Sequence, residues 1–297
     1  MPAMDQGSTD RIGFIGGGNM ARALIAGLIR QGLPAQRICV GEPDTAARAA
    51  LTQAFNVTAV ADNAAAMHGA ALVVLAVKPQ DALAVLQELR GSWGAADTVL
   101  LSIAAGLTID ALAGVCPPGT AIVRAMPNRP ALVGAGITGL YAPAQVGSPQ
   151  RARAERIAEA AGSVVWLRSE AELDVVTALS GSGPAYFFLL AELLAQAGAT
   201  LGLPADTATL LAVQTLYGAG LLAQRAAVGA GRADGAALAH ALAEERRAVT
   251  SKGGTTEAAL RVLQEGGLDA LIARALRAAA ARSAELAVQR APSAQPR

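Results

Sequence analysis

Gly13-Phe14-Ile15-Gly16-Gly17-Gly18-Asn19-Met20-Ala21 is the stretch that decides the fold of this chain. It contains the pattern G-x-G-x-x-A, after an apolar strand and at the start of a helix. In that context Gly16 permits a tight turn, Gly18 lets the backbone approach a pyrophosphate, and Ala21 allows close packing of helix on strand. The helix N-terminus offers free N–H groups and a positive dipole end to phosphate. The stretch therefore predicts a dinucleotide site, although a glycine-rich turn without a ligand would share the pattern.

A repeating alternation of strands and helices continues from this stretch. Strands are expected at Arg11–Gly16, Arg37–Gly41, Val57–Ala59, Ala71–Val77, Thr98–Ile103, Thr120–Ala125, Gly136–Tyr141 and Ser163–Leu167. Helices are expected at Asn19–Gln31, from a cap at Asp44 to about Ala54, and at Asn63–His68, Gln80–Leu89 and Thr108–Ala113. The alternation predicts an α/β fold, a Rossmann-type parallel sheet with right-handed crossovers.

The pattern changes near residue 168. Ser169 and Glu172 have the spacing of a capping box, and strand signals largely vanish after them. Long helices are expected at Gly183–Leu201, Ala205–Val228, Asp234–Ala248, Thr255–Glu265 and Leu268–Gln289. The sequence therefore predicts a dinucleotide-binding domain over residues 11–168 and an all-α domain over 169–290. Residues 1–10 and 291–297 are expected to be flexible tails.

Composition narrows the class of protein. Of the 297 residues 53% are hydrophobic but only 3% are aromatic, and the net charge of +1 gives no field that recruits nucleic acid or an anionic membrane. The helix Ala205–Val228 is apolar on all sides, which predicts burial against another subunit. Apolar runs such as Ala70–Val77 are shorter than the roughly 20 residues of a membrane-spanning helix. With no secretory signal and two thiols, Cys39 and Cys116, in apolar surroundings, we expect a cytoplasmic protein.

The end of the second strand bears on the choice of nicotinamide cofactor. Glu42 follows Gly16 at close to the usual offset of the acid that binds the adenosine ribose. A carboxylate there accepts from a 2′-hydroxyl group and repels a 2′-phosphate, which favours NADH over NADPH. The alternative is that Glu42 points to solvent while Asp44 caps a helix, and the sequence does not decide between the two.

Other segments lie where ligands bind in open α/β sheets, at the carboxyl ends of strands. These are Ala76-Val77-Lys78-Pro79-Gln80 and Ser102-Ile103-Ala104-Ala105-Gly106, and Lys78 is one of only two lysines in the chain. Taken alone, Ser102–Gly106 is better explained as an ordinary strand-to-loop turn. Arg124–Pro130 follows another strand, where Asn128 is either a ligand for a carboxamide or substrate, or part of a rigid turn.

Two segments of the helical domain are rich in small and polar residues. Ser180–Tyr186 precedes a long helix and leaves room beside a nicotinamide. Thr250–Glu257 opens another helix, where backbone N–H groups form a natural carboxylate cradle, although a capped helix start has the same appearance. His68 and His240 have no suggestive partners, and the sequence shows neither a metal cluster nor a nucleophile–base pair, so we expect no metal.

In this order the segments resemble the pyrroline-5-carboxylate reductase family, from Arg11 to about Val288. The segments that support the resemblance are Gly13–Ala21, Ala76–Pro79, Ser102–Gly106, Arg124–Asn128, Ser180–Tyr186 and Thr250–Thr256. The resemblance implies NAD(P)H-dependent reduction of the C=N bond of 1-pyrroline-5-carboxylate to L-proline, the last step of proline biosynthesis. It also implies that the all-α domain over 169–290 is a substrate and dimerisation domain, and it implies higher oligomers, often decamers built from dimers.

The resemblance also assigns roles to positions of this sequence. Thr256 would hydrogen-bond the imine nitrogen, and the backbone around it would bind the substrate carboxylate. The expected substrate-binding residues are Ser251, Gly253, Gly254, Thr255 and Thr256. The expected cofactor-binding residues are Ile15, Gly16, Gly17, Gly18, Asn19, Met20, Glu42, Asn63, Ala76, Val77, Lys78, Pro79, Ser102, Ile103 and Ala104. The chain departs from the family's usual residues at Arg129, Lys252 and Glu42.

Two other functions compete with this interpretation. A β-hydroxyacid dehydrogenase shares the two-domain plan, but that family uses a lysine where this chain has Phe187. A protein that binds NAD(P) without turnover is the other, and it would not need Ser251–Thr256. We therefore expect a reductase of the cyclic imine.

Overall fold

The computed structural model describes residues 11–94, 97–230 and 235–290, and it divides into two compact units. One unit comprises the chain up to Ser182 together with the residues from Ala278 on, and the other comprises Gly183–Arg277. The expected tails at 1–10 and 291–297, and the expected helix start at Asp234, lie outside the described residues.

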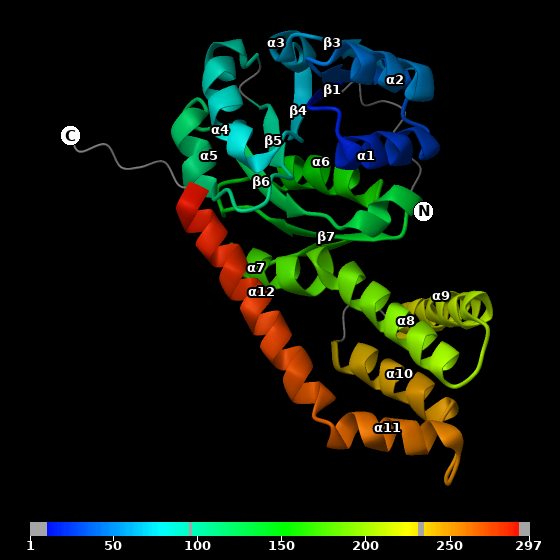
Figure 1. Cartoon of the computed structure of the whole chain (residues 1–297). Coiled ribbons are helices and arrows are strands. Elements are labelled where there is room, and N and C mark those ends of the chain that lie inside the picture. The colour runs from blue at the N-terminus through cyan, green and yellow to red at the C-terminus, as the bar shows by residue number, and fades with distance from the viewer. Residues whose placement is uncertain (1–10, 95–96, 231–234, 291–297) are drawn as a thin grey trace. The chain divides into compact units, whose positions relative to one another are not determined.

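An eight-stranded sheet forms the centre of the first unit, in the order β3-β2-β1-β4-β5-β6-β7-β8 (Figure 1). The strands are β1 (Arg11–Ile15), β2 (Ile38–Gly41), β3 (Thr58–Val60), β4 (Ala70–Leu75), β5 (Val99–Ser102), β6 (Ala121–Met126), β7 (Gly136–Tyr141) and β8 (Gly162–Trp166). The helices are α1 (Asn19–Arg30), α2 (Thr45–Phe55), α3 (Asn63–Met67), α4 (Pro79–Glu88), α5 (Ile109–Val115), α6 (Ser148–Glu159) and α7 (Glu172–Val176). The expected α/β class with a Rossmann-type sheet is confirmed.

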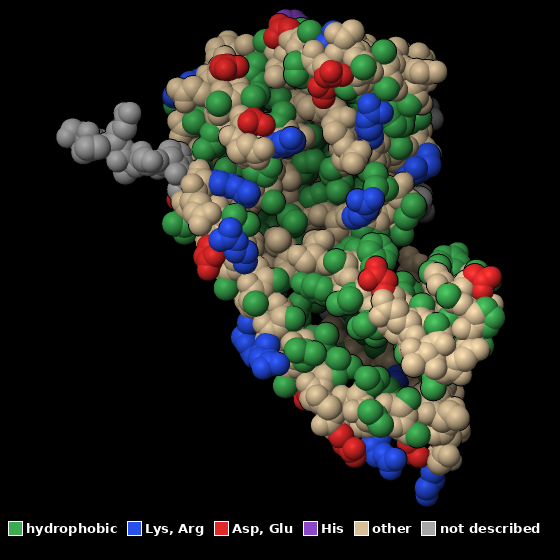
Figure 2. All heavy atoms as spheres, in the orientation of Figure 1, with side chains coloured by type: hydrophobic (Ala, Val, Ile, Leu, Met, Phe, Trp, Pro, Cys, Tyr) green, Lys and Arg blue, Asp and Glu red, His purple; other side chains and the backbone are tan. Residues whose placement is uncertain are grey.

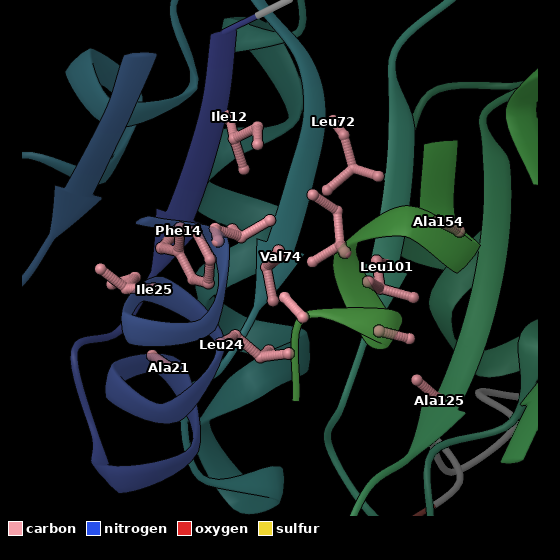
Figure 3. Packing of buried hydrophobic residues seen from close by; sticks show 14 of the residues in the cluster. Ile12, Phe14, Ala21, Leu24, Ile25, Leu72, Val74, Leu101, Ala125 and Ala154 are labelled. Atoms are coloured by element: carbon pink, nitrogen blue, oxygen red, sulfur yellow. The ribbon is translucent and has the colours of Figure 1, made fainter. Parts of the chain in front are cut away.

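Apolar side chains cover both faces of this sheet. Phe14, Val74 and Leu101 point to the face covered by α1 and α6, where they pack with Leu24 and Ala154 (Figure 3). Alternate residues of the same strands, which include Ile15, Val73 and Leu100, pack on α3, α4 and α5. Burial on both faces explains why the strands appear in the sequence as continuous apolar runs.

The expected parallel sheet contains one antiparallel pair of strands. β6 and β7 are antiparallel, with Arg124 opposite Tyr141, and the other pairs are parallel. The connection between them contains only a 3₁₀ turn at Arg129–Val133, and a parallel crossover needs a dozen or more residues. β7 must therefore return along β6.

Two local features also differ from the expectation. Helix α6 was missed, because it is mostly polar and buries only Ala154, Ile157 and Ala158. The capping box expected from Ser169 is not formed, since the Glu172 carboxylate accepts from the N–H of Arg168 at 2.9 Å. By contrast Asp44 caps α2 as expected, accepting from the N–H of Ala47 at 2.7 Å.

The first compact unit extends past residue 168 to Ser182. After β8 the chain forms α7 and a single π-helical turn at Thr177–Gly181, both within the first unit. The amide of Asn128 donates to the carbonyl oxygen of Ser180 at 3.2 Å, and Ser283 donates to Asp174 at 2.7 Å. These contacts join the segment to the sheet domain although its local pattern is helical.

The second unit is built from helices, and the expected ones are present. They are α8 (Gly183–Thr200), α9 (Ala205–Ala230), α10 (Gly235–Ala248), α11 (Thr255–Glu265) and the first turns of α12 (Leu268–Arg290).

The helical stretch Glu172–Thr200 is long and apolar enough to span a membrane by length and composition alone, with a mean hydropathy of 1.3 and 17% of the apolar window buried. The unbroken apolar runs in the sequence did not indicate this stretch, because Glu192 interrupts the run. Apolar side chains exposed in such numbers are expected to be buried against another surface.

Candidate active site

The glycine turn after β1 has the geometry that a pyrophosphate requires. Gly16 has φ of +95°, which favours glycine, and its N–H donates to the carbonyl oxygen of Gly41 at 2.8 Å. A Cβ built on Gly18 would meet no atom within 4 Å, so the space in front of this backbone is open. Gly18 is the N-cap of α1, and neither a capping side chain nor an acidic residue serves the first turn there. The N–H groups at the start of α1 are therefore available to an anion.

The turn lies where the strand order reverses. β1 pairs with β2 on one side and with β4 on the other, so the chain leaves the sheet in opposite directions at its carboxyl edge. The N–H of Ala76 donates to the carbonyl oxygen of Ile15 at 2.8 Å, which holds the segment after β4 against the glycine turn. Pro79 then starts α4, and the side chain of Lys78 is exposed. The expected residues of both segments therefore lie next to each other at the carboxyl edge of the sheet.

The half-buried carboxylate of Glu42 is held beside the glycine turn. One oxygen accepts from the N–H of Gly17 at 3.0 Å and the other from the N–H of Asp44 at 3.1 Å. The guanidinium of Arg48 donates to the carbonyl oxygens of Glu42 and Pro43, at 2.8 and 2.7 Å. The carboxylate thus has a fixed position at the end of β2.

Two buried polar atoms at the same edge have no partner within the described residues. They are Oδ1 of Asn63, at the start of α3, and Oγ of Ser102, at the end of β5. A Cβ on Gly41 would lie 2.2 Å from the Asn63 oxygen, so this amide is packed against the end of β2. A third such atom, Nε1 of Trp93, is outside the expected set. A buried polar atom without a hydrogen bond costs free energy of folding. The Asn63 oxygen and the Ser102 hydroxyl are therefore suited to hydrogen-bond a polar ligand.

The remaining residues that we expect on the cofactor side lie along the same edge. The N–H of Ile103 donates to the carbonyl oxygen of Leu75 at 3.2 Å, and Ala104 is buried. The side chain of Ile15 is fully buried, so only its backbone faces the turn. The structure thus places the expected set at the ends of β1, β2, β4 and β5 and the start of α3, which fits a dinucleotide.

The expected substrate segment belongs to the second unit. Gly254 is the N-cap of α11, no side chain caps that end, and its own N–H donates to the carbonyl oxygen of Ser251 at 3.0 Å. The N–H of Gly253, where φ is +73°, donates to the carboxylate of Glu257 at 2.6 Å. This N–H therefore already holds a carboxylate, which is the chemistry that we expect of the segment.

The threonines at the start of α11 differ in exposure. Thr255 is exposed and Thr256 is half-buried. In the described part of the chain the hydroxyl of Thr256 makes no hydrogen bond. The first-turn N–H groups and this hydroxyl are left for a ligand.

Asn128 has a structural position. Its side-chain oxygen accepts from the N–H of Ile137 at 2.9 Å, and its amide nitrogen donates to Ser180. Both ends of the amide are therefore used to join the end of β6 to β7 and to the π-helical turn. Of the two alternatives for this residue, the contacts favour the rigid turn.

Among the described residues, the titratable groups with shifted pKa values lie outside the site. Burial raises the pKa of the Cys116 thiol to about 12, and Cys39 is also buried. The hydrogen bond from Arg153 holds the pKa of Asp97 below its usual value. His68 is exposed, and His240 is exposed with Nε2 3.3 Å from Glu244. These groups therefore place no acid or base beside the glycine turn.

Sequence reasoning missed the residues that hold the loop between β5 and α5. Arg290, at the end of α12, donates to the carbonyl oxygen of Ala105 at 2.8 Å. Glu170 accepts from the N–H of Ile109 at 2.7 Å and from Arg124 at 2.7 Å. These partners are 185 and 61 positions from the loop residues that they bind, and no local pattern signals such pairs.

Comparison with known proteins identifies the family. Residues 170–286 match the family model described as pyrroline-5-carboxylate reductase dimerisation, and residues 11–106 match one described as NADP oxidoreductase coenzyme F420-dependent. The pyrroline-5-carboxylate reductase of Pseudomonas aeruginosa is 45% identical, over 95% of this chain and 98% of its own. The chain belongs to the pyrroline-5-carboxylate reductase family. The resemblance drawn from six short segments is thereby confirmed.

Solved structures agree with this assignment. The pyrroline-5-carboxylate reductase of Coxiella burnetii is 40% identical, with a TM-score of 0.85 over 94% of this chain and 99% of its own. The pyrroline carboxylate reductase of Plasmodium falciparum, solved with NADP bound, is 25% identical, with a TM-score of 0.75 over 94% and 98%. The chain is therefore an oxidoreductase of an NAD(P)-dependent fold and has the dimerisation domain of pyrroline-5-carboxylate reductases.

Proposed function

We propose that this chain reduces the C=N bond of 1-pyrroline-5-carboxylate to give L-proline. The observation that supports this most strongly is the 45% identity to the Pseudomonas aeruginosa reductase along nearly the whole of both chains. The open glycine turn and the uncapped start of α11 supply the two kinds of site that the reaction needs, one for a dinucleotide and one for a carboxylate.

The bond changes assign simple tasks to the protein. A bound reduced nicotinamide would supply a hydride to the carbon of an imine that solvent has already protonated at nitrogen. The π electrons of the C=N bond would become the nitrogen lone pair, which gives a secondary amine. Thr256 would donate a hydrogen bond to that lone pair as it forms, and the backbone N–H groups of the Ser251–Thr256 segment would hold the carboxylate. A protonated imine is already a good hydride acceptor, so positioning and exclusion of water suffice without a strong general acid.

NADH is the proposed preferred cofactor. The carboxylate of Glu42 is held by two backbone N–H groups beside the turn, so it meets the adenosine ribose as a fixed negative charge. A ribose hydroxyl can donate to it, whereas a 2′-phosphate would be repelled. The NADP-bound structure of the Plasmodium falciparum relative makes NADPH the alternative to test.

A homodimer is the proposed unit of assembly, with higher oligomers such as decamers built from it. In the second unit α8 and α9 expose many large apolar side chains, among them Phe187, Phe188, Leu193, Leu210 and Tyr217. Figure 2 shows hydrophobic side chains at the surface of the helical part of the chain. Exposed apolar surface of this kind marks an interface. A second copy of the same helices would cover this surface.

The proposed location is the cytoplasm, which follows from the proposed role in biosynthesis.

The direct test is an assay of NADH and NADPH oxidation with racemic 1-pyrroline-5-carboxylate. A parallel assay follows the reduction of NAD⁺ and NADP⁺ with β-hydroxyacids. We expect turnover with the imine and none with the hydroxyacids. A clear rate with a hydroxyacid and none with the imine would replace the proposal with a β-hydroxyacid dehydrogenase. Dinucleotide binding without turnover of either would indicate a binding protein.

The bond between Glu257 and Gly253 leads to a prediction about substrate affinity. The Glu257 carboxylate would compete with the substrate carboxylate for the Gly253 N–H. We therefore expect Glu257→Gln to lower the KM for the imine roughly threefold. The effect is small because Glu257 is exposed and solvent screens its charge. Steady-state kinetics at low salt measure it. Glu265→Gln, at the other end of α11, is the matched control, and a KM that stays unchanged or rises in Glu257→Gln contradicts the competition.

A further inference from the structure

The loop between β5 and α5 is fixed by side chains from distant parts of the chain. We propose that Arg290 is a positioning residue that holds this loop in the form that receives the nicotinamide half of the cofactor. The inference rests on the proposed function, in which Ser102, Ile103 and Ala104 approach the nicotinamide ribose.

Arg290 contacts the loop at two adjacent residues. Its Nη1 atom donates to the carbonyl oxygen of Ala105 at 2.8 Å. A Cβ built on Gly106 would lie 2.6 Å from the same nitrogen, so the guanidinium is packed directly against this glycine, where φ is +72°. A bond from a charged donor to the Ala105 carbonyl fixes the plane of the peptide between the two residues. The backbone that follows Ala104 is thereby set by Arg290.

The end of α12 is itself held in place. The hydroxyl of Ser283 is buried and donates to the carboxylate of Asp174 at 2.7 Å, two turns before Arg290. Arg290 is half-buried, so its guanidinium has limited freedom. The guanidinium therefore approaches the loop from a defined position.

The far end of the loop has a second support. One carboxylate oxygen of Glu170 accepts both from the N–H of Ile109, at the start of α5, and from the buried Arg124. Arg124 is the neighbour of Ser102 in the sheet, and the Ser102 hydroxyl is one of the buried groups without a partner within the described residues. The loop thus starts at an unsatisfied polar group and is held at its middle and its end. Such preorganisation suits a segment that binds a ligand.

The test compares two ligands that share the adenosine diphosphate half. Calorimetry measures the binding of each ligand to wild type, Arg290→Met, Arg290→Lys and Arg282→Met. One ligand is adenosine diphosphate. The other is NADH or NADPH, whichever binds wild type more tightly. Methionine keeps an apolar stem and removes the donors, and lysine restores a charged donor. Arg282 is exposed on the same helix and pairs only locally with Glu285, which makes its variant the matched control.

We expect Arg290→Met to weaken the nicotinamide cofactor about tenfold, a factor that corresponds to ~1.4 kcal/mol, and to leave adenosine diphosphate unchanged. Arg290→Lys should recover most of the loss, and Arg282→Met should match wild type. If Arg290→Met binds both ligands as wild type does, or weakens both equally, Arg290 does not position the nicotinamide side. If the variants show the expected binding pattern but the protein does not reduce the imine, the inference is supported and the proposed function is refuted. If wild type binds neither NADH nor NADPH, both are refuted.

Discussion

Thr256→Ala is expected to lower kcat/KM for 1-pyrroline-5-carboxylate by about a hundredfold, the usual effect of removing one donor from a developing charge. The hydroxyl is half-buried at the start of α11 and makes no hydrogen bond within the described residues, so its loss disrupts no contact of the fold. Binding of NADH or NADPH should stay within twofold of wild type or so, because a local substitution in the second unit leaves the glycine turn intact. Steady-state kinetics and cofactor titration measure the two effects separately.

Two further variants isolate the hydroxyl. Thr256→Val keeps the shape of the side chain without the donor and should be as slow as Thr256→Ala. Thr256→Ser keeps the donor and should lie within about fivefold of wild type, since only packing changes. Wild-type turnover in both Thr256→Ala and Thr256→Val would contradict the assignment of the hydroxyl to the imine nitrogen.

The edge of the sheet proposed to hold the cofactor was predictable because its signals are local. The residues Gly16–Ala21 require a strand before them and a helix after them, and the carboxyl ends of parallel strands meet at one edge. Ala76–Pro79 and Ser102–Ala104 therefore came together once the strands were recognised. The apolar helices of the second unit were equally visible, since their periodicity and their Gly and Pro breaks lie within single segments.

What the sequence did not reveal depends on tertiary contacts. Helix α6 has few apolar positions, and only its packing on the sheet shows why Ala154 and Ile157 suffice. The direction of β7 followed from a connection too short for a crossover, which periodicity does not report. The link from Arg290 to Ala105 joins residues 185 positions apart, and an arginine in a helix rich in Ala and Arg carries no mark of such a role.

Glu42→Ser is expected to raise the ratio of kcat/KM for NADPH to that for NADH by about a hundredfold. A carboxylate ~4 Å from a phosphate costs about 4 kcal/mol per pair of unit charges at an effective dielectric constant of ~20. Glu42 cannot swing away without giving up its bonds to the N–H groups of Gly17 and Asp44. The guanidinium of Arg48, bound to the carbonyl oxygens of Glu42 and Pro43, offsets part of that repulsion, which is why we expect less than the full Coulomb term.

Glu42→Gln separates charge from hydrogen bonding at the ribose. It keeps an oxygen that can accept from the 2′-hydroxyl group and from the Gly17 N–H, but it removes the negative charge. If repulsion sets the preference, Glu42→Gln should gain NADPH activity with little loss of NADH activity, whereas Glu42→Ser should also lose NADH affinity because its side chain is too short to reach the hydroxyl. An unchanged ratio in both variants would mean that the carboxylate, although fixed beside the glycine turn, only closes the end of β2 and does not read the ribose.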